Sequence, residues 1–186
     1  RKRMLLVAAR SKDAALLNAE TGAILRLVKD CQPCANGLCG TEQLLLSAEA
    51  ERSFVHVWSY RKEQPQYKCQ APERICCIAC TADSAHCAGG GSSGKLYLWE
   101  ITTGRLLSSW DAHFKSCTVL AFTGSDGFLA SAGEDAILLL WSLADVLHAA
   151  SALLPPPPPL RTWTDHSMAI SALCVAQCGQ HDLICS

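Results

Sequence analysis

The sequence predicts an all-β protein that forms part of a β-propeller, and three observations support this prediction. Trp58, Trp99 and Trp141 recur at intervals of 41 and 42 residues, within the roughly 40 to 45 residues of a propeller blade. Each of these tryptophans ends a short apolar run typical of a β-strand. Residues that favour tight turns separate the runs. We therefore expect three full blades flanked by two partial ones.

The clearest unit runs from residue 113 to residue 141. Its apolar and β-branched runs predict strands at residues 117–122, 128–132 and 137–141. Glycine and aspartate occupy the two short segments between these runs, as expected for turns. The unit therefore has the strand-turn-strand pattern of one antiparallel blade.

Within this unit the residues resemble a WD40 repeat. In that family a His before the first strand, a Ser or Thr on the second, an Asp in the next turn and a Trp on the third form one hydrogen-bonded chain. The residues in those four places are His113, Ser131, Asp135 and Trp141. The indole N–H can donate to the hydroxyl, the hydroxyl to one imidazole nitrogen, and the other imidazole N–H to the carboxylate. The resemblance implies a structural tetrad that holds the blade together.

Serine, histidine and aspartate also make up hydrolase triads, so catalysis by Ser131 is the competing hypothesis. A buried indole would use the Ser131 hydroxyl as its acceptor. In addition, no G-x-S-x-G nucleophile elbow surrounds this serine. We therefore predict no catalytic residue, no cofactor and no enzymatic activity.

Alignment on Trp141 places the preceding units in register. Leu17 occupies the tryptophan position of the first unit, and residues 17–22 match residues 99–104. Residues 89–94, which are rich in glycine, are expected to form a loose turn. The expected strands are 4–8, 14–18 and 23–27 in the first unit, 37–39, 43–47, 53–58 and 66–69 in the second, and 75–80, 86–88, 96–99 and 106–110 in the third.

The second and third units lack the aspartate of the tetrad. Arg52 stands six residues before Trp58, and Ser93 stands six before Trp99, where the best unit has Asp135. We therefore expect the tetrad to be missing or replaced in these two blades.

The region after Trp141 departs from the simple repeat. Residues 142–150 favour a helical turn because leucine and alanine are good helix formers. Pro155 to Pro159 must leave the helix because proline lacks an amide hydrogen, and they favour an extended polyproline II segment. We expect one domain, residues 1–186, with a helical turn and proline-rich insertion at 142–160. The proline run could dock into an aromatic-lined groove, but we favour a loop insertion.

The chain is expected to return to the sheet at residues 161–163, as the fourth strand of this blade. His166 then opens a fifth unit, in the position that His113 has in the fourth. The apolar residues 169–175 and 183–185 predict two strands of this partial unit.

The chain contains twelve cysteines, which we expect to be reduced thiols because no secretory signal opens the sequence. Two pairs, Cys31 with Cys34 and Cys77 with Cys80, have the spacing of zinc ligands. Residues three apart on a strand point to opposite faces, which disfavours the second pair. The first pair, with Cys39 nearby, would lie in a loop without a histidine to complete four ligands. We therefore predict no metal site.

Composition excludes two further classes of protein. The net charge is −1, and basic residues are massed only at residues 1–3, so no broad nucleic-acid surface is expected. The apolar runs are far shorter than the roughly 18 residues of a membrane span. The chain begins with Arg rather than Met, so we expect a piece of a longer protein.

A closer resemblance covers residues 75–172. The segments that carry it are residues 98–100, 103–107, 122–124 and 141–147, with the proline-bearing excursion that returns at Trp163 and His166. Together they resemble the WD-repeat subunit of the rixosome, the WD-repeat-protein-eighteen or Ipi-three family.

The resemblance implies a scaffold in the nucleolus and nucleoplasm that joins other rixosome subunits, the AAA ATPase of large-subunit maturation and the pre-ribosomal particle. It further implies a role in ribosomal RNA processing and in replication licensing. The alternative is another WD40 interaction scaffold, such as a substrate receptor of a ubiquitin ligase.

Overall fold

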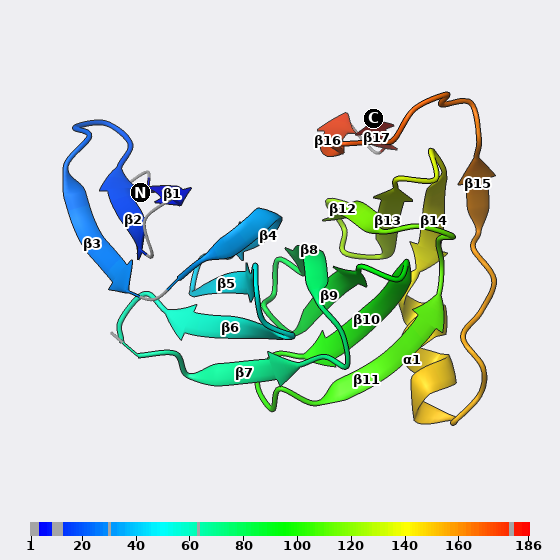
Figure 1. Ribbon diagram of the computed structural model, residues 1–186, viewed down its shortest axis with the longest axis horizontal. Coiled ribbons are helices and arrows are strands. Elements are labelled where there is room, and N and C mark those ends of the chain that lie inside the picture. Colours follow the sequence, from blue (N-terminus) through cyan, green and yellow to red (C-terminus); the bar gives the residue numbers. More distant parts are fainter. Residues whose placement is uncertain (1–3, 9–12, 30, 63, 179–180) are drawn as a thin grey trace.

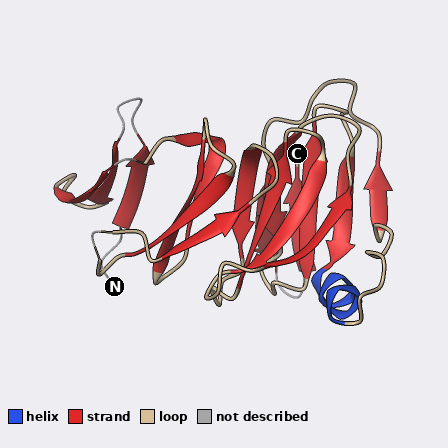
Figure 2. Ribbon diagram, turned by 60° about the horizontal axis from the view of Figure 1, so that its bottom comes forward, coloured by secondary structure: helices blue, strands red, loops and turns tan. Residues whose placement is uncertain are grey.

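The computed structural model describes residues 4–8, 13–29, 31–62, 64–178 and 181–186. Strands dominate these residues, and a short helix follows β14 (Figures 1 and 2). Within each unit the strands pair antiparallel with their neighbours in the chain. The predicted all-β fold, a partial propeller, is confirmed.

Three four-stranded blades form the centre of the molecule. The second blade contains β4 (Pro33–Gly40), β5 (Leu44–Glu49), β6 (Phe54–Ser59) and β7 (Tyr67–Gln70). The third contains β8 (Ile75–Cys80), β9 (His86–Gly91), β10 (Lys95–Glu100) and β11 (Leu106–Asp111). The fourth contains β12 (Cys117–Phe122), β13 (Phe128–Gly133), β14 (Leu138–Ser142) and β15 (Arg161–Trp163).

Smaller sheets flank these blades. At one end, β1 (Met4–Ala8), β2 (Asp13–Asn18) and β3 (Ile24–Lys29) form a three-stranded sheet. At the other end, β16 (Cys174–Cys178) and β17 (His181–Cys185) form a hairpin. The sheets follow one another in an arc, with the two end units far apart (Figure 1).

Adjacent blades approach most closely at their first strands. A parallel pair between Asn36 and Cys77 joins β4 to β8, so the second and third blades form one eight-stranded sheet. The register between β4 and β5 shifts between Pro33 and Leu38. Asn36 lies in this irregular stretch, and its Nδ2 donates to the carbonyls of Thr118, at 2.7 Å, and Ser171, at 3.3 Å. One side chain thus connects the second blade to the fourth and to the segment before β16.

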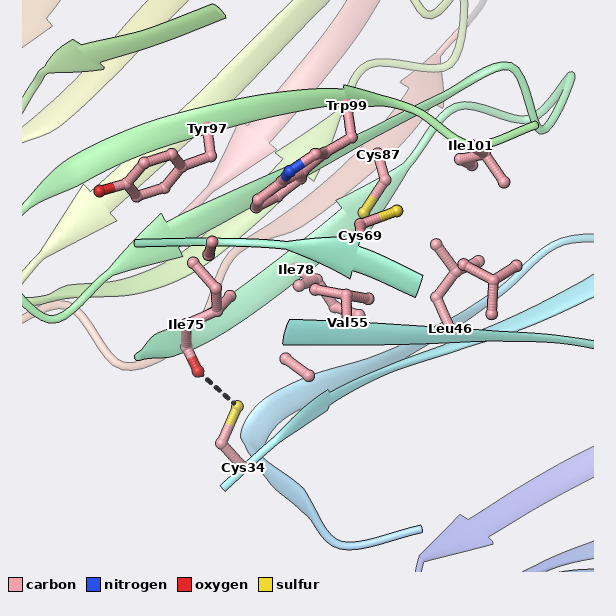
Figure 3. Packing of buried hydrophobic residues seen from close by; sticks show 13 residues of the cluster. Cys34, Leu46, Val55, Cys69, Ile75, Ile78, Cys87, Tyr97, Trp99 and Ile101 are labelled. Atoms are coloured by element: carbon pink, nitrogen blue, oxygen red, sulfur yellow. Dashed lines mark hydrogen bonds between the residues drawn. The ribbon is translucent and has the colours of Figure 1, made fainter. Parts of the chain in front are cut away.

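The apolar cores lie between blades. Figure 3 shows the cluster between the second and third blades, in which Leu46 and Val55 come from the second blade and Ile78 and Trp99 from the third. Such packing explains why the middle strands are buried on both faces. A second cluster joins the third blade to the fourth and includes Trp141.

The repeating tryptophans have equivalent surroundings. Trp58 lies on β6, Trp99 on β10 and Trp141 on β14, each on the third strand of its blade. All three are at most 3% exposed. Each packs in the cluster shared with the preceding blade. Leu17, which holds this position in the first unit, lies on β2 and is half-buried.

The structure corrects the expected turn at residues 89–94. Gly89, Gly90 and Gly91 belong to β9, and the turn is confined to the residues after them. A Cβ atom on Gly89 would lie 2.7 Å from the Trp99 ring. Glycine has low strand propensity, so the sequence pattern indicated a turn. Here glycine is needed because the indole packs directly against the β9 backbone.

Two further boundaries differ from the prediction. Cys34 lies on β4 and not in a loop, because β4 begins earlier than the expected strand at residues 37–39, whereas Cys39 falls within that expected strand. In the fifth unit, β16 begins at Cys174, whereas residues 169–173 are not in a strand. Ile170 is nevertheless buried, and its amide donates to the carbonyl of Gly133 on β13. The apolar residue there contacts the fourth blade without forming a strand.

The excursion within the fourth blade begins with helix α1 (Leu143–Ser151). The Ser142 hydroxyl caps it by accepting from the Asp145 amide at 3.2 Å. The buried face of α1 packs against β11. The prolines then run along the outer edge of the blade before β15 pairs with β14 (Figure 1). In the described ranges, no helix is long and apolar enough to cross a membrane.

Candidate functional site

The structure brings the four predicted tetrad residues together. Trp141 Nε1 donates to Ser131 Oγ at 3.0 Å, and this oxygen lies 2.9 Å from His113 Nε2. His113 Nδ1 lies 3.1 Å from each carboxylate oxygen of Asp135. The four side chains come from β14, β13, the segment before β12 and the turn after β13. One connected chain therefore spans the width of the blade.

Every side-chain polar group of the tetrad has a hydrogen-bond partner. With Nδ1–H donating to Asp135, the Nε2 atom of His113 can accept the Ser131 proton. Asp135 also accepts from the backbone amides of Phe114, at 3.1 Å, and Ile137, at 3.2 Å. The carboxylate therefore fixes the segment before β12 and the turn before β14.

The electrostatics of His113 favour its neutral form. Burial lowers the pKa of His113 below its usual 6.5, although Asp135 acts in the opposite direction. A neutral imidazole is the form that can accept from Ser131. Because Ser131 is fully buried and already contacts an indole, its hydroxyl is not positioned to attack a substrate.

The third blade has a different polar network in place of the tetrad. Gly89 occupies the register position of Ser131. Trp99 Nε1 instead donates to the carbonyl of Gln70 at 3.0 Å. Glu73, just before β8, accepts from Tyr97 Oη at 2.7 Å and from the Ser93 amide at 2.7 Å. Glu73 therefore ties the start of the blade to β10 and to the turn after β9.

The charge state of Glu73 follows from these contacts. Partial burial raises its pKa, but hydrogen bonds from Ser93, Tyr97 and Ser92 outweigh this effect and lower the pKa below its usual value. The same contacts act on Tyr97, whose pKa is raised by burial and by the nearby carboxylate. The network is thus built around an ionised carboxylate.

The second blade uses yet another carboxylate. Glu49 is 6% exposed and accepts from Ser47 Oγ at 3.3 Å and from the Gln32 amide at 3.2 Å. His56 Nδ1 lies 3.5 Å from Glu49 Oε1. Burial raises the pKa of Glu49, but these groups, His56 first, lower it overall. Arg52, the residue in the Asp135 position, instead lies over the Phe54 ring.

Sequence reasoning did not find Glu49 or Glu73. The available signal was weak: one acidic residue ends β5 and another stands two residues before β8, both beside apolar strands.

His166 is the predicted opening residue of the fifth unit. Its Nε2 atom lies 2.7 Å from Ser186 Oγ. The contact between His113 and Ser131 likewise joins a histidine Nε2 to a serine Oγ.

Hydrogen bonds also connect the turns at one rim of the blades. Ser84 Oγ, after β8, donates to Thr41 Oγ1, after β4, at 2.6 Å. The Ala82 amide donates to Asp126 Oδ2, after β12, at 2.7 Å. An open cleft of about 570 Å³ lies among these turns, with Cys80 and Phe122 in its lining. We call it the rim cleft.

A second cleft of about 480 Å³ lies between the fourth blade and the final hairpin. Its lining includes Leu140, Trp163, His166 and Leu183. Trp163 is 36% exposed and Leu183 is 50% exposed. The rim cleft has the more polar lining of the two.

The cysteines with zinc-like spacing do not come together as ligand sets. Cys34 Sγ contacts backbone carbonyls of Ile75 and Cys76, and Cys77 Sγ lies beside Cys117 rather than Cys80. Among the residues that the structure describes, no group of three or more His, Cys, Asp or Glu side chains is arranged to hold a metal ion.

Comparison with known proteins identifies related sequences. The family described as "WD domain, G-beta repeat" matches residues 104–142, which include all four tetrad positions. Pre-rRNA-processing protein IPI3 of Mycosarcoma maydis is 34% identical over 143 residues, covering 73% of this chain and 24% of the relative. Protein ROOT INITIATION DEFECTIVE 3 of Arabidopsis thaliana is 36% identical over 129 residues, covering 67% of this chain and 30% of the relative.

A human protein is also similar. WD repeat-containing protein 18 of Homo sapiens is 30% identical over 138 residues, which cover 74% of this chain and 31% of the relative. The chain therefore spans less than a third of the length of these curated relatives.

Proposed function

Because the chain belongs to the WD-repeat family of pre-rRNA-processing protein IPI3 and WD repeat-containing protein 18, we propose that it is part of a non-enzymatic scaffold in ribosomal RNA processing. The observation that carries this proposal is the similarity at 30 to 36% identity over about 70% of the chain. The proposal concerns the whole protein, of which this chain would supply several adjacent blades.

The more specific proposal is the WD-repeat subunit of the rixosome. Its partners would be the other rixosome subunits, the AAA ATPase of large-subunit maturation and the pre-ribosomal particle. The protein would act in the nucleolus and nucleoplasm, with a further role in DNA replication licensing. These statements rest on family resemblance, since the fold by itself does not specify a partner.

The site geometry supports a scaffold rather than an enzyme. The Ser, His and Asp side chains that could suggest catalysis are used internally by the tetrad. The blades are tied to one another through Asn36 and through the turns at the rim cleft. Blades connected in this way, with open clefts between their turns, are suited to holding partners in fixed positions.

The proposal can be tested with the full-length protein in its own cells. Depletion should increase ribosomal RNA precursors that retain the internal spacer, and affinity capture should recover the rixosome subunits with the AAA ATPase. Re-expression of the protein with Ser125→Ala, an exposed turn substitution, should restore processing and serves as the matched control.

Capture of ubiquitin-ligase adaptors without ribosome-assembly factors would favour the alternative, a ligase substrate receptor. Normal precursor processing after complete depletion would contradict the ribosomal proposal directly.

A further inference from the structure

Two cysteines from adjacent blades lie in contact at the rim cleft. Cys39 is the penultimate residue of β4, and Cys80 is the last residue of β8. They are 41 residues apart, one blade period, and their Sγ atoms are 3.2 Å apart, with Cys39 donating to Cys80. Equivalent ends of neighbouring first strands thus present their thiols to each other.

The position of Cys80 gives this pair access to small molecules. Both cysteines are half-buried, and Cys80 lines the rim cleft of about 570 Å³. A second cross-blade pair, Cys77 and Cys117, has its sulfurs 3.6 Å apart, but both residues are 0% exposed. The two pairs have similar sulfur–sulfur distances but differ in exposure to solvent. Cys77 and Cys117 therefore serve as the buried control for Cys39 and Cys80.

The hydrogen bond also gives the two thiols different reactivity. Donation from Cys39 lowers the pKa of Cys80, and the same contact raises the pKa of Cys39. The thiolate is the reactive form of cysteine towards oxidants. Cys80 also lines the rim cleft, so it is the group that meets an oxidant first, and Cys39 is placed beside it to react second.

We propose that Cys39 and Cys80 form a site of reversible oxidation, at which hydrogen peroxide converts the two thiols into a disulfide between the second and third blades. The Cys80 sulfur attacks one peroxide oxygen, the O–O bond breaks, and water leaves after proton transfer, so Cys80 becomes a sulfenic acid. The Cys39 sulfur then attacks the Cys80 sulfur and displaces a second water. Two thiols lose two electrons in total, and one peroxide gains them.

The disulfide would add a covalent connection between blades that are otherwise held together by apolar packing and hydrogen bonds. Bond formation requires the sulfurs to approach from 3.2 Å to about 2.05 Å. The turns after β4 and β8 are already linked through Thr41 and Ser84. Oxidation would therefore fix one wall of the rim cleft.

The test treats the full-length protein with hydrogen peroxide, blocks remaining thiols by alkylation and maps disulfides by mass spectrometry. We expect a Cys39–Cys80 disulfide that dithiothreitol removes, formed roughly tenfold faster than any oxidation of Cys77 or Cys117. Cys39→Ser should leave a Cys80 sulfenic acid that dimedone traps. Cys174→Ser, at an exposed cysteine of the final hairpin, should leave the Cys39–Cys80 disulfide unchanged.

Two outcomes would overturn the proposal. In one, Cys39 and Cys80 remain fully alkylated while the exposed Cys174 and Cys185 are oxidised. In the other, Cys77 and Cys117 are oxidised as fast as the rim pair, which would show that the reaction proceeds through unfolding of the blades.

Discussion

Each of the three full blades has a hydrogen-bond network around a carboxylate, and a different set of side chains forms it in each blade. The fourth uses His113 and Asp135, the third uses Glu73, and the second uses Glu49. In each case a carboxylate binds the backbone near the start of the blade or in its turns. Burying a carboxylate, even partly, is unfavourable without such partners. The shared requirement is therefore a paired carboxylate, and the residue that supplies it varies.

Loss of the central hydroxyl should weaken the fourth blade. Ser131→Ala removes the partner of both Trp141 Nε1 and His113 Nε2 in a fully buried place, so we expect a loss of about 1 to 3 kcal/mol. Faster hydrogen exchange of the β13 and β14 amides in the full-length protein would measure it. Ser125→Ala, at an exposed turn position, should change protection by less than about 0.5 kcal/mol. Equal protection in both variants would show that the tetrad does not stabilise the blade.

The stability of the fourth blade should also depend on pH. The pKa of His113 is lower in the folded protein than its usual 6.5 because the imidazole is buried. The unfolded chain therefore binds the proton more readily, and the stabilisation present at neutral pH is lost as pH falls below about 6.5. Hydrogen exchange of β13 between pH 7.5 and 5.5, corrected for the intrinsic exchange rate, measures this loss. His113→Gln should flatten the dependence, and an equally steep profile in that variant would assign it to other groups.

Burial on both faces decides whether a segment forms a strand more than the intrinsic strand propensity of its residues does. β9 contains three consecutive glycines and is nevertheless a strand, paired with β10 and, across a register shift between Ile75 and Cys77, with β8. Cβ atoms on these glycines would meet Trp99, Cys117 and Glu73 at 2.4 to 2.7 Å. Gly89 and Gly90 are therefore required by side chains from neighbouring strands, and Gly91 faces the carboxylate end of Glu73, whereas the local sequence favours a turn.

Substitution in β9 should show this directly. Gly89→Ala places a methyl group 2.7 Å from the Trp99 ring and 3.2 Å from Ile75, so we expect a loss of about 1 to 3 kcal/mol from overpacking. Gly127→Ala is the matched control, since its nearest atom is a serine hydroxyl at 3.4 Å. Thermal unfolding of the full-length protein compares the two. Similar melting temperatures would mean that Trp99 can shift to make room.

At the scale of the whole molecule, each blade depends on its neighbours. The apolar clusters lie between consecutive blades, so among the described residues the outer face of each end unit packs against no further blade. The exposed residues confirm this at both ends: Ile24 is 63% exposed and Leu27 is 53% exposed on β3, and Leu183 is 50% exposed on β17. The terminal sheets also carry unpaired strand edges.

We therefore predict that residues 1–186 expressed alone aggregate or unfold over a broad range. Apolar end faces and free edges favour association, and blades at the ends can separate independently of the central ones. Light scattering and calorimetry measure the two effects. A sharp, reversible two-state transition of a monomer would contradict this prediction.

The sequence by itself determined the repeat, most strand positions and the four members of the tetrad. The expected strands at residues 75–80, 117–122 and 161–163 coincide with β8, β12 and β15. These features follow from local apolar patterns and from one family signature within a single repeat. They require no knowledge of how the blades pack, because each pattern lies within about forty residues.

Only the tertiary structure decided the partners that cross between blades. It placed Gly89 under Trp99, brought Cys39 beside Cys80, and turned Asn36 towards the fourth blade. It also selected Glu49 and Glu73 as the carboxylates of two blades. These contacts depend on twist, register shifts and the distance between packed sheets, which are set by the combined volume of side chains from two blades. A local sequence pattern does not specify that volume, because the side chains that fill it come from two blades.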